Sequence, residues 1–580
     1  MVFSLLKKHD HWVKDVLGLL LLFTLFYLLW LGSYPLFTPD EGRYSEVARE
    51  MVATHDYLTP RLNGVPFLDK PALYYWLQAL AIHLVGINEW ALRLFPALFG
   101  VLGAIVTYLA GRWLFDRRTG LLSAVILATT PLYFAGAHYA NLDLEVAVLI
   151  SCSLLFFITG VMRSSPSRIY FFIAAYSMAG LAFLTKGMIG IAFPVMIAGA
   201  WILSLRRFSL LKQVYLPTGI AIILLINLPW YVLVQNANPD FLHYFFLTQQ
   251  VTRFLSATEF NNKTPFWFYA PIIMTGFFPW TCFLVQSIRD YVRNILRKQN
   301  RYQVELFLLL WVAIVFVFFS IPRSKTIGHI FPILPGLALL VGSYLSRHFE
   351  NAQQQGIRRG IYSVAVLGSL LAVIGFSLLH ARFMHMPQGF VFYFSAIASL
   401  ILVGSLASLA LINQKTLAPL FALCACSSVI LLLVLTAGAG QLNPHSAKFL
   451  SAELHTIIGP QDEIVNYYKY YYDVPLYLNR NVIVVNNWNS PSIPTHDNWA
   501  RELWVGMQMQ PHHPLLIDDA LFWQHYESDR RVFVFLNKNY FDQFKLRANS
   551  YFYLGSDGDT LLLSNKPTLL ALRIQQSSPY

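Results

Sequence analysis

Long apolar stretches recur along the first three quarters of the chain, and short polar segments separate them. About 20 apolar residues in a row can cross the hydrocarbon core of a membrane as a helix. The pattern predicts thirteen spans: 16–36, 91–111, 119–136, 144–162, 169–185, 187–205, 214–235, 265–287, 304–321, 327–346, 361–380, 389–412 and 417–438. The stretch 72–86 has only 15 residues and contains Gln78 and His83. It predicts an amphipathic helix at the membrane surface.

The loops between the spans differ in their content of Lys and Arg. Alternate loops hold most of these cations: Arg112, Arg117 and Arg118; Arg163 and Arg168; Arg206, Arg207 and Lys212; Arg289, Arg293, Arg297, Lys298 and Arg301; Arg347, Arg358 and Arg359; and Lys415. Cytoplasmic loops are enriched in Lys and Arg. The first span follows Lys7, Lys8 and Lys14 and is too long for a signal-peptide core. We therefore expect an uncleaved, cytoplasmic N-terminus and a C-terminus on the outer side.

The pattern changes after residue 438 to a mixture of polar and apolar positions. Short apolar runs at 482–485, 532–536 and 560–563 are bounded by Asn, Asp and Gly, which is typical of buried strands. We therefore predict a transmembrane domain at 1–438, with a first outer loop at 38–90, and a small α/β domain at 439–580 on the periplasmic side.

Composition supports a membrane protein. Of 580 residues, 56% are hydrophobic and only 12% are charged, and the mean hydropathy is +0.50. Soluble domains carry about 25% charged residues, so a soluble or disordered chain is excluded. The net charge of +12 is concentrated in short loops, which favours membrane topology over nucleic-acid binding. The four cysteines lie in apolar runs and offer neither a zinc-ligand spacing nor a disulfide framework. No cofactor is expected.

The first outer loop carries candidate chemistry. Pro39 followed by Asp40 and Glu41 suits the first turn of a helix, where the helix dipole favours carboxylates. Arg43 follows one turn later. Such a helix is either a reactive surface facing the headgroups or an ordinary solvated, salt-bridged helix. Lys70 either binds a phosphate as a point charge or extends to the membrane surface.

Further ionisable residues occur where outer loops meet the spans. Asp143, Lys186 and Lys325 are in such positions. Charged groups at membrane depth are costly and usually functional. Two carboxylates and several cations at one membrane face suggest chemistry on a phosphate-bearing lipid.

Several motifs together resemble a known family. They are Asp40-Glu41-Gly42-Arg43-Tyr44, Ala48-Arg49-Glu50-Met51, Pro60-Arg61-Leu62-Asn63-Gly64, Asp69-Lys70-Pro71, Leu184-Thr185-Lys186-Gly187, Pro229-Trp230-Tyr231, Arg253-Phe254, Ser324-Lys325 and Asn466-Tyr467-Tyr468. The chain resembles the lipid A aminoarabinose (4-amino-4-deoxy-L-arabinose) transferases, which are GT-C membrane glycosyltransferases related to protein O-mannosyltransferases. The resemblance implies an inverting, metal-independent enzyme of the bacterial inner membrane that acts in lipid A modification and polymyxin resistance.

The resemblance also implies roles for single residues. It makes Asp40 the general base or acceptor-orienting group, and Asp143 the second acidic residue. Basic residues expected to hold the donor phosphate are Lys70, Arg43, Arg253 and Lys186. Further candidates near the site are Asp69, Glu41, Tyr44, Lys325 and His329.

Substrates follow from the resemblance in general terms. The expected donor is an undecaprenyl phosphate-linked sugar, and the expected acceptor is lipid A or another envelope glycolipid. This chain has Asp69 where the family commonly has Glu, Gln249-Gln250 where it has His, and His329 where it has Tyr. Because of these departures, the resemblance supports the general reaction better than it supports specificity for aminoarabinose. Transfer to protein hydroxyls is the alternative enzyme. A lipid-linked sugar transporter is disfavoured, because we find no internal repeat of the kind common in transporters.

Overall fold

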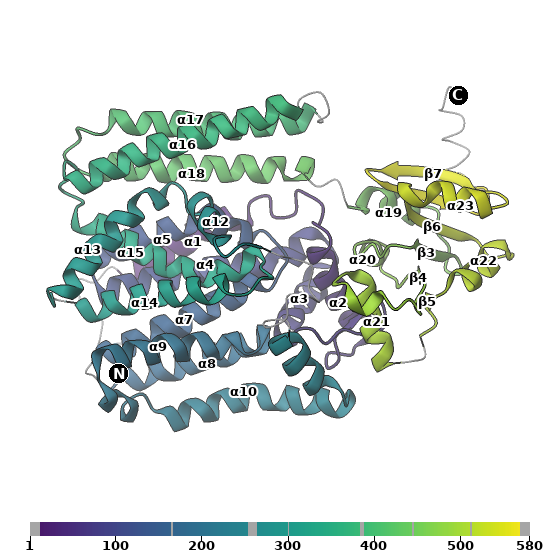
Figure 1. Ribbon diagram of the computed structural model, residues 1–580, viewed down its shortest axis with the longest axis horizontal. Helices are drawn as coiled ribbons and strands as arrows, with labels where there is room; N and C mark the ends of the chain where they lie inside the picture. Colours follow the sequence, from purple (N-terminus) through teal and green to yellow (C-terminus); the bar gives the residue numbers. More distant parts are fainter. Residues whose placement is uncertain are drawn as a thin grey trace. The chain divides into compact units, whose positions relative to one another are not determined.

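The computed structural model describes residues 12–163, 166–252, 264–299, 301–382, 388–442, 446–510 and 513–568. The chain divides into two compact units, each coloured along its sequence in Figure 1. The helical unit comprises Met1–Leu31, Arg93–Pro229 and Thr264–Ala439. The mixed unit comprises Gly32–Leu92, Trp230–Lys263 and Gly440–Tyr580, so the first outer loop belongs to the same unit as the C-terminal residues.

The long apolar stretches form helices. These are α1 (Trp12–Leu28), α4 (Glu89–Leu114), α5 (Arg117–Ala128), α6 (Pro131–Ala137), α7 (Asp143–Met162), α8 (Arg168–Lys186), α9 (Ile189–Leu205), α10 (Leu216–Ala237), α12 (Tyr269–Gly276), α13 (Leu284–Leu296), α14 (Tyr302–Ser320), α15 (Leu334–Arg347), α16 (Gln355–Arg382), α17 (Gln388–Ala410) and α18 (Ala418–Gly438). Short 3-10 helices η2 (Phe208–Lys212), η4 (Trp280–Phe283), η5 (Ile327–Ile333) and η7 (Ala439–Leu442) connect some of them.

The prediction of a polytopic helical membrane protein is confirmed. In the described part of the chain, nine helices are long and apolar enough to cross a membrane, or eleven if each of two bent pairs counts as one span. Helices α1 and α9 are not among them, because with 17 residues each they are slightly too short. The count of thirteen spans stays a prediction. Helix α3 (Leu73–Val85) has 13 residues, about 20 Å at 1.5 Å per residue, which is less than the hydrocarbon thickness.

Two predicted spans are bent. The stretch 119–136 breaks between α5 and α6 with a change of direction of 65°, and 265–287 breaks between α12 and η4 with one of 105°. Pro131 begins α6 and Pro279 precedes η4. Proline has no backbone N–H and clashes with the preceding helical turn, which accounts for both bends.

Close packing of α5 against α15 organises the middle of the helical unit. Gly342 of α15 lies directly against Ser123 of α5, where any added Cβ would collide with the Ser123 hydroxyl. Small residues allow two spanning helices to approach closely. The contact fixes α15 next to the residues that begin α5.

The mixed unit contains a six-stranded sheet. Its elements are α2 (Asp40–Thr54), β1 (Arg61–Leu62), β2 (Val65–Pro66), α3, η3 (His243–Thr252), α19 (Lys448–His455), β3 (Glu463–Tyr467), α20 (Val474–Leu478), β4 (Ile483–Val485), η8 (Ile493–Thr495), α21 (Trp499–Met509), β5 (Leu516–Ile517), α22 (Asp519–Glu527), β6 (Val532–Asn537), η9 (Lys538–Tyr540), α23 (Phe541–Arg547), β7 (Phe552–Asp557) and β8 (Thr560–Ser564).

The strand order is β5-β4-β3-β6-β8-β7, and the predicted C-terminal α/β fold is confirmed. Strands β5, β4, β3 and β6 are parallel, whereas β8 and β7 are antiparallel. Val465 of β3 pairs with Ile483 and Val534. One face of the sheet packs against aromatic side chains of α22 and α23, including Phe522 and Phe544. The three predicted strands are β4, β6 and β8, while β3, β5 and β7 were not predicted.

The first outer loop is joined to the C-terminal residues by buried polar contacts. Asn63 acts like a strand backbone, because its side-chain amide donates to Val482 O and its side-chain oxygen accepts from Val482 N, both at 2.9 Å. Arg49 donates to both carboxylate oxygens of Glu46 at 2.7 and 2.6 Å, and also to the Asn481 side chain. The buried residues of the first outer loop and of the C-terminal segment therefore form a single core.

Glu50 completes this buried network. Its Oε1 accepts from Gly64 N at 2.7 Å and lies 3.7 Å from Arg49. Burial and the neighbouring charge of Glu46 raise the pKa of Glu50 from 4.5 to about 8. One arginine thus faces two buried carboxyls, and Glu50 holds a proton at neutral pH.

We predict that this proton makes stability depend on pH. Between about pH 5 and 8 folded Glu50 keeps a proton that the unfolded chain has released, so the free energy of unfolding falls as pH rises, by at most about 1.4 kcal/mol per pH unit. Asp473, whose pKa burial raises to about 6, contributes in the lower part of this range. The melting temperature of Glu50→Gln should therefore exceed that of the wild type above pH 8 and vary less between pH 6 and 9.

Exposed Glu453 provides the matched control. Glu453→Gln should melt with the wild-type pH profile. If Glu50→Gln also keeps that profile, Glu50 does not carry the buried proton.

Candidate active site

Asp40 begins helix α2, and Arg43 lies one turn further along the same face. The Asp40 side chain is 38% exposed, so its carboxylate reaches solvent at the N-terminal end of the helix. One Arg43 nitrogen donates to Asp40, and the other terminal nitrogen donates to Glu502 of α21. Arg43 is thus held between a carboxylate of the first outer loop and one of the C-terminal residues.

Aromatic side chains surround this triad. Arg43 lies over the Tyr44 ring at 5.0 Å and over the Tyr472 ring at 5.9 Å. The Tyr472 hydroxyl donates to Glu502 Oε2 at 2.6 Å. Burial raises the pKa of Glu502, although Arg43 opposes this shift. Burial acts against the charge of Arg43 as well, but Glu502, Tyr44 and Asp40 together raise the pKa of its guanidinium.

Glu41 and Tyr44 support the start of α2. Glu41 is fully buried, and its Oε2 accepts from Phe37 N at 2.7 Å, which fixes the chain entering the helix. Tyr44 is buried against the rings of Tyr74 and Tyr75 at 5.8 and 6.2 Å. Both residues therefore hold Asp40 and Arg43 in place through packing and the helix entry.

Asp69 and Lys70 lie in the same unit, beside the segment that includes η3. Asp69 Oδ1 accepts from the Tyr244 hydroxyl at 2.5 Å and from Gln249 Nε2 at 3.0 Å. Lys70 Nζ donates to the Asp69 backbone oxygen at 3.0 Å. Asp69 also contributes to the raised pKa of Glu502, after burial and opposite to Arg43. The Asp69 cluster and the Arg43 triad consequently form one charged region.

A second cluster lies in the helical unit. Asp143 is the first residue of α7, and Lys186 is the last residue of α8. The two side chains form an ion pair with 14% and 11% exposure. Gly328 of η5 lies so close that an added Cβ would collide with the Asp143 carboxylate. The backbone of η5 therefore lies against the carboxylate that pairs with Lys186.

Two further predicted residues lie near the start of η5. Lys325 is buried, and its Nζ donates to Thr264 O at 3.3 Å. His329 is stacked on Phe319, with ring centroids 5.2 Å apart. Lys325 lies between α14 and η5, whereas His329 lies within η5 and directly follows Gly328.

The structure thus brings the predicted residues together in two groups. Asp40, Glu41, Arg43, Tyr44, Asp69 and Lys70 belong to the mixed unit, and Asp143, Lys186, Lys325 and His329 belong to the helical unit. Arg253 lies outside the described residues. The roles given to these residues from the sequence stay predictions.

Sequence reasoning missed several members of the charged region. Glu502 and Tyr472 contact Arg43, and Tyr244 and Gln249 contact Asp69. Of these, Gln249 was already named as a departure from the family pattern that bears on substrate specificity. Nothing in the local sequence around Glu502 distinguishes it from an ordinary carboxylate on a helix.

These side chains can orient an acceptor and stabilise a phosphate. An exposed carboxylate at a helix start can position a nucleophile or accept its proton, and fixed cations stabilise the negative charge of a leaving phosphate. Within the described residues, no three His, Cys, Asp or Glu side chains converge as a metal site. Freedom from metal and cofactor stays a prediction.

Comparison with known proteins identifies relatives of this chain. Residues 69–233 match the model of a dolichyl-phosphate-mannose-protein mannosyltransferase family. An undecaprenyl phosphate-alpha-4-amino-4-deoxy-L-arabinose arabinosyl transferase of Aeromonas hydrophila is 30% identical over 390 residues, which cover 66% of this chain and 70% of that protein. The Enterobacter protein of the same name is 33% identical over 366 residues, covering 62% of this chain and 64% of that protein.

Solved structures show the same fold. The crystal structure of a protein named ArnT from Cupriavidus metallidurans, bound to undecaprenyl phosphate, has a TM-score of 0.84 at 24% identity. The match covers 97% of this chain and 99% of that one. An Archaeoglobus fulgidus oligosaccharyltransferase has a TM-score of 0.52 at 14% identity, covering 92% of this chain and 71% of that one. With its relatives in sequence and its membrane-spanning helices, the chain belongs to the undecaprenyl phosphate-alpha-4-amino-4-deoxy-L-arabinose arabinosyl transferase family of membrane glycosyltransferases.

Proposed function

We propose that this chain transfers 4-amino-4-deoxy-L-arabinose, or a related sugar, from undecaprenyl phosphate to lipid A or another envelope glycolipid. The observation that carries the choice of substrates is the identity of 30–33% to arabinosyl transferases over more than 360 residues. The chemistry is supported by an exposed carboxylate, Asp40, that Arg43 and Glu502 hold at the start of a helix.

The reaction exchanges one glycosidic bond for another. An acceptor oxygen attacks the anomeric carbon of the sugar while the bond from that carbon to the undecaprenyl phosphate oxygen breaks. The phosphate leaves with the bonding electrons, and the configuration at the anomeric carbon inverts. Lys70, Lys186 and Arg253 are the cations proposed to stabilise the leaving phosphate.

Asp40 acts on the acceptor. A hydroxyl acceptor gives its proton to the Asp40 carboxylate as the new bond forms. A phosphate acceptor is already ionised, so Asp40 then contributes orientation more than proton removal. Arg43 is also one of the basic residues proposed to hold the phosphate of the sugar donor. Because both of its ion-pair partners are carboxylates, its charge first serves to orient Asp40. Asp143, which pairs with Lys186 and lies against Gly328, is the second acidic residue proposed to act in the reaction.

Transfer to protein is the second candidate. The match of residues 69–233 to the protein mannosyltransferase model favours it, because that family glycosylates proteins. Incubating the purified enzyme with the lipid-linked sugar and either lipid A or membrane proteins separates the two. If sugar appeared on proteins and not on lipid A, protein would replace lipid A as the proposed acceptor.

The orientation is part of the proposal. The chain is a multi-pass inner-membrane protein, and the distribution of Lys and Arg among its loops supports a cytoplasmic N-terminus with the residues after 438 in the periplasm.

The first prediction concerns Asp40. Purified wild-type protein in detergent should transfer the sugar to lipid A, an output that a transporter lacks without compartments. Asp40→Asn keeps the size of the side chain and removes its charge. It should lower transfer by about 10²–10⁴-fold with a hydroxyl acceptor and by less with a phosphate, while donor binding is retained. Exposed Asp529 gives the control Asp529→Asn, which should be fully active.

Two results would count against this account. Absence of transfer by the wild type with every lipid-linked donor tried would contradict the enzyme. Equal transfer by Asp40→Asn would leave the enzyme and remove Asp40 from its chemistry.

The second prediction concerns the confinement of Asp143. Gly328→Ala should push the Asp143 carboxylate away from η5, and a displacement of about 1 Å at a reacting group can cost about 10²-fold in rate. Gly199→Ala is the matched control, because nothing lies within 4 Å of an added Cβ there. Equal activity of both variants, measured at equal amounts of folded protein, would show that Asp143 needs no such confinement.

The third prediction concerns topology. A reporter fused after residue 350 should be cytoplasmic, and one fused after residue 440 should be periplasmic. The sidedness of each reporter is measured by its enzymatic activity in intact cells. Finding both on the same side would break the proposed orientation.

A further inference from the structure

Helix α13 differs from the spanning helices of the helical unit. It follows the 105° change of direction after α12 and has 13 residues, which is about 20 Å at 1.5 Å per residue. It also contains Arg289, Asp290 and Arg293. A helix that is so short and so charged does not cross the hydrocarbon core by itself. Its length and composition suit the surface of a membrane.

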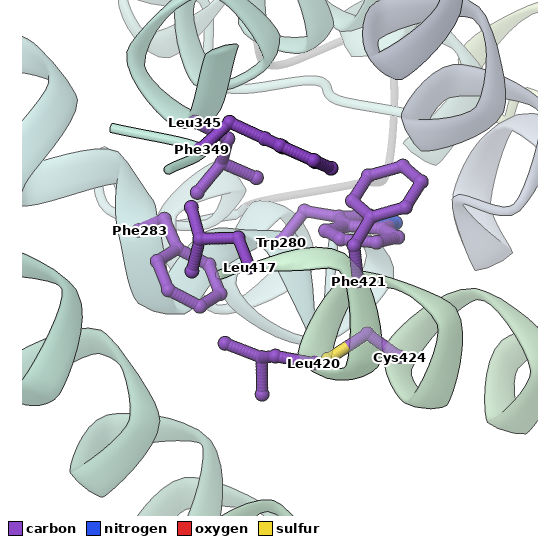
Figure 2. A pocket seen from close by; sticks show the side chains of 8 residues that line it. All are labelled: Trp280, Phe283, Leu345, Phe349, Leu417, Leu420, Phe421 and Cys424. Atoms are coloured by element: carbon purple, nitrogen blue, oxygen red, sulfur yellow. The ribbon is translucent and has the colours of Figure 1, made fainter. Parts of the chain in front are cut away.

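The start of α13 is anchored by η4, which directly precedes it. Figure 2 shows Trp280 and Phe283 of η4 within one group of apolar side chains that includes Phe421 of α18. The rings of Trp280 and Phe421 are 5.1 Å apart, and Trp280 Nε1 donates to Thr129 Oγ1 at 3.2 Å. These contacts fix the point from which α13 begins.

One side of α13 is held against α14 and α15, which lie beside it (Figure 1). Tyr291 and Asn294 are buried on this side, and Asn294 Nδ2 donates to Glu305 Oε1 of α14 at 3.0 Å. Arg347 of α15 pairs with Asp290 at 3.0 Å and with Glu305 at 2.5 Å. These bonds determine which sides of α13 face outward.

A second side of α13 is apolar and exposed. Val285, Val292 and Leu296 are 56%, 42% and 78% exposed. They are seven and four residues apart, so they lie in one row along the helix. We call these three residues the apolar row. Because removing such side chains from water is favourable, the apolar row favours contact with hydrocarbon.

A third side of α13 is basic. Arg289, Arg293 and Arg297 are spaced four residues apart, so they form a row of arginines on one face that ends with the residue after the helix. All three are exposed, and none has an ion-pair partner among the described residues. Like charges at this spacing repel each other. An external anion between these arginines therefore stabilises the arginine row.

The two rows are neighbours on the helix. Arg289 lies four residues after Val285 and three before Val292, and residues with these separations are adjacent on a helix surface. A ligand surface that contacts α13 from outside thus meets apolar and cationic side chains together.

Helix α13 lies at the end of the helical unit opposite to Asp143. The span Ile327–Arg347 starts with η5, where Gly328 lies against Asp143, and it ends at Arg347, which pairs with Asp290 of α13. One span therefore separates Asp143 from α13. In the orientation proposed above, α13 is at the cytoplasmic face, where the membrane surface carries anionic lipids.

We propose that α13 lies in the cytoplasmic headgroup layer and binds anionic phospholipids, with the arginine row at the lipid phosphates and the apolar row among the upper parts of the acyl chains. Helices that combine such sides lie in the membrane interface. A soluble anion would satisfy the arginines but leave the apolar row in water. The site uses no residue of the proposed catalytic clusters, so its test is independent of sugar transfer.

Hydrogen exchange of the purified full-length protein in nanodiscs measures α13 directly. The bilayers contain phosphatidylethanolamine alone or mixed with phosphatidylglycerol of the same acyl chains. Bound lipid opposes opening of the helix, so the amides of α13 should exchange more slowly in the mixed bilayer, by about fivefold for each arginine that holds an anionic headgroup. Arg289→Gln/Arg293→Gln/Arg297→Gln should exchange equally in the two bilayers.

The control removes the same charge elsewhere. Arg358→Gln/Arg359→Gln/Lys415→Gln changes three exposed cations of other loops and should keep the wild-type difference between the bilayers. Loss of the difference in this control would overturn the proposal, because net charge and not the arginine row would then attract the lipid.

A second variant tests the apolar row. Val292→Asn/Leu296→Asn keeps the three arginines, and its α13 should exchange faster than that of the wild type in both bilayers; unchanged exchange would remove the apolar row from the contact. Both variants of α13 change exposed side chains, so the fold is retained. Equal exchange of wild-type α13 in the two bilayers, or a wild-type difference in the arginine variant, would overturn the proposal. Inorganic phosphate that slows exchange as much as phosphatidylglycerol does would also overturn it, since a free anion would then suffice.

Discussion

The contacts of the mixed unit depend on how Arg43 is neutralised. A guanidinium in a largely buried position is costly unless charged partners surround it, and here those partners are Asp40 on its own helix and Glu502 from α21. The arginine thereby fixes the direction of the Asp40 carboxylate and joins the first outer loop to the C-terminal residues. Losing either carboxylate changes the electrostatic environment of the other.

This arrangement gives the C-terminal residues a part in holding the first outer loop in place. Helix α21 packs against β2, Glu502 reaches Arg43 from α21, and Asn63 and Arg49 bond to the segment before β4. Buried carboxyl groups such as that of Glu50 are tolerated only because they are partly protonated or paired with a cation. A rigid first outer loop, and with it a fixed Asp40, follows from these contacts.

The sequence allowed the fold to be predicted more fully than the site. Spanning helices and the strands β4, β6 and β8 have local patterns of hydrophobicity, and the Asp40-Glu41-Gly42-Arg43 motif sits at a helix start that local rules identify. The partner of Arg43, however, lies 459 positions away, and Tyr244 lies 175 positions from Asp69. Such pairs are set by tertiary packing. The spans 119–136 and 265–287 were predicted without the bends at Pro131 and Pro279, although proline gives these a local cause. The close approach of Gly328 to Asp143 depends on tertiary packing and has no local signal.

A double-mutant cycle on Arg43→Met and Glu502→Leu tests the central claim most directly, with thermal unfolding of the purified protein as the measurement. Glu502→Leu leaves Arg43 with Asp40 as its remaining carboxylate partner, and Arg43→Met leaves buried Glu502 without its cation, so each single variant should be destabilised. The double variant should lose less than the sum of the two single effects, with a coupling energy on the order of 1–3 kcal/mol. Strictly additive effects would show that the two residues do not act as a pair, and would contradict the account.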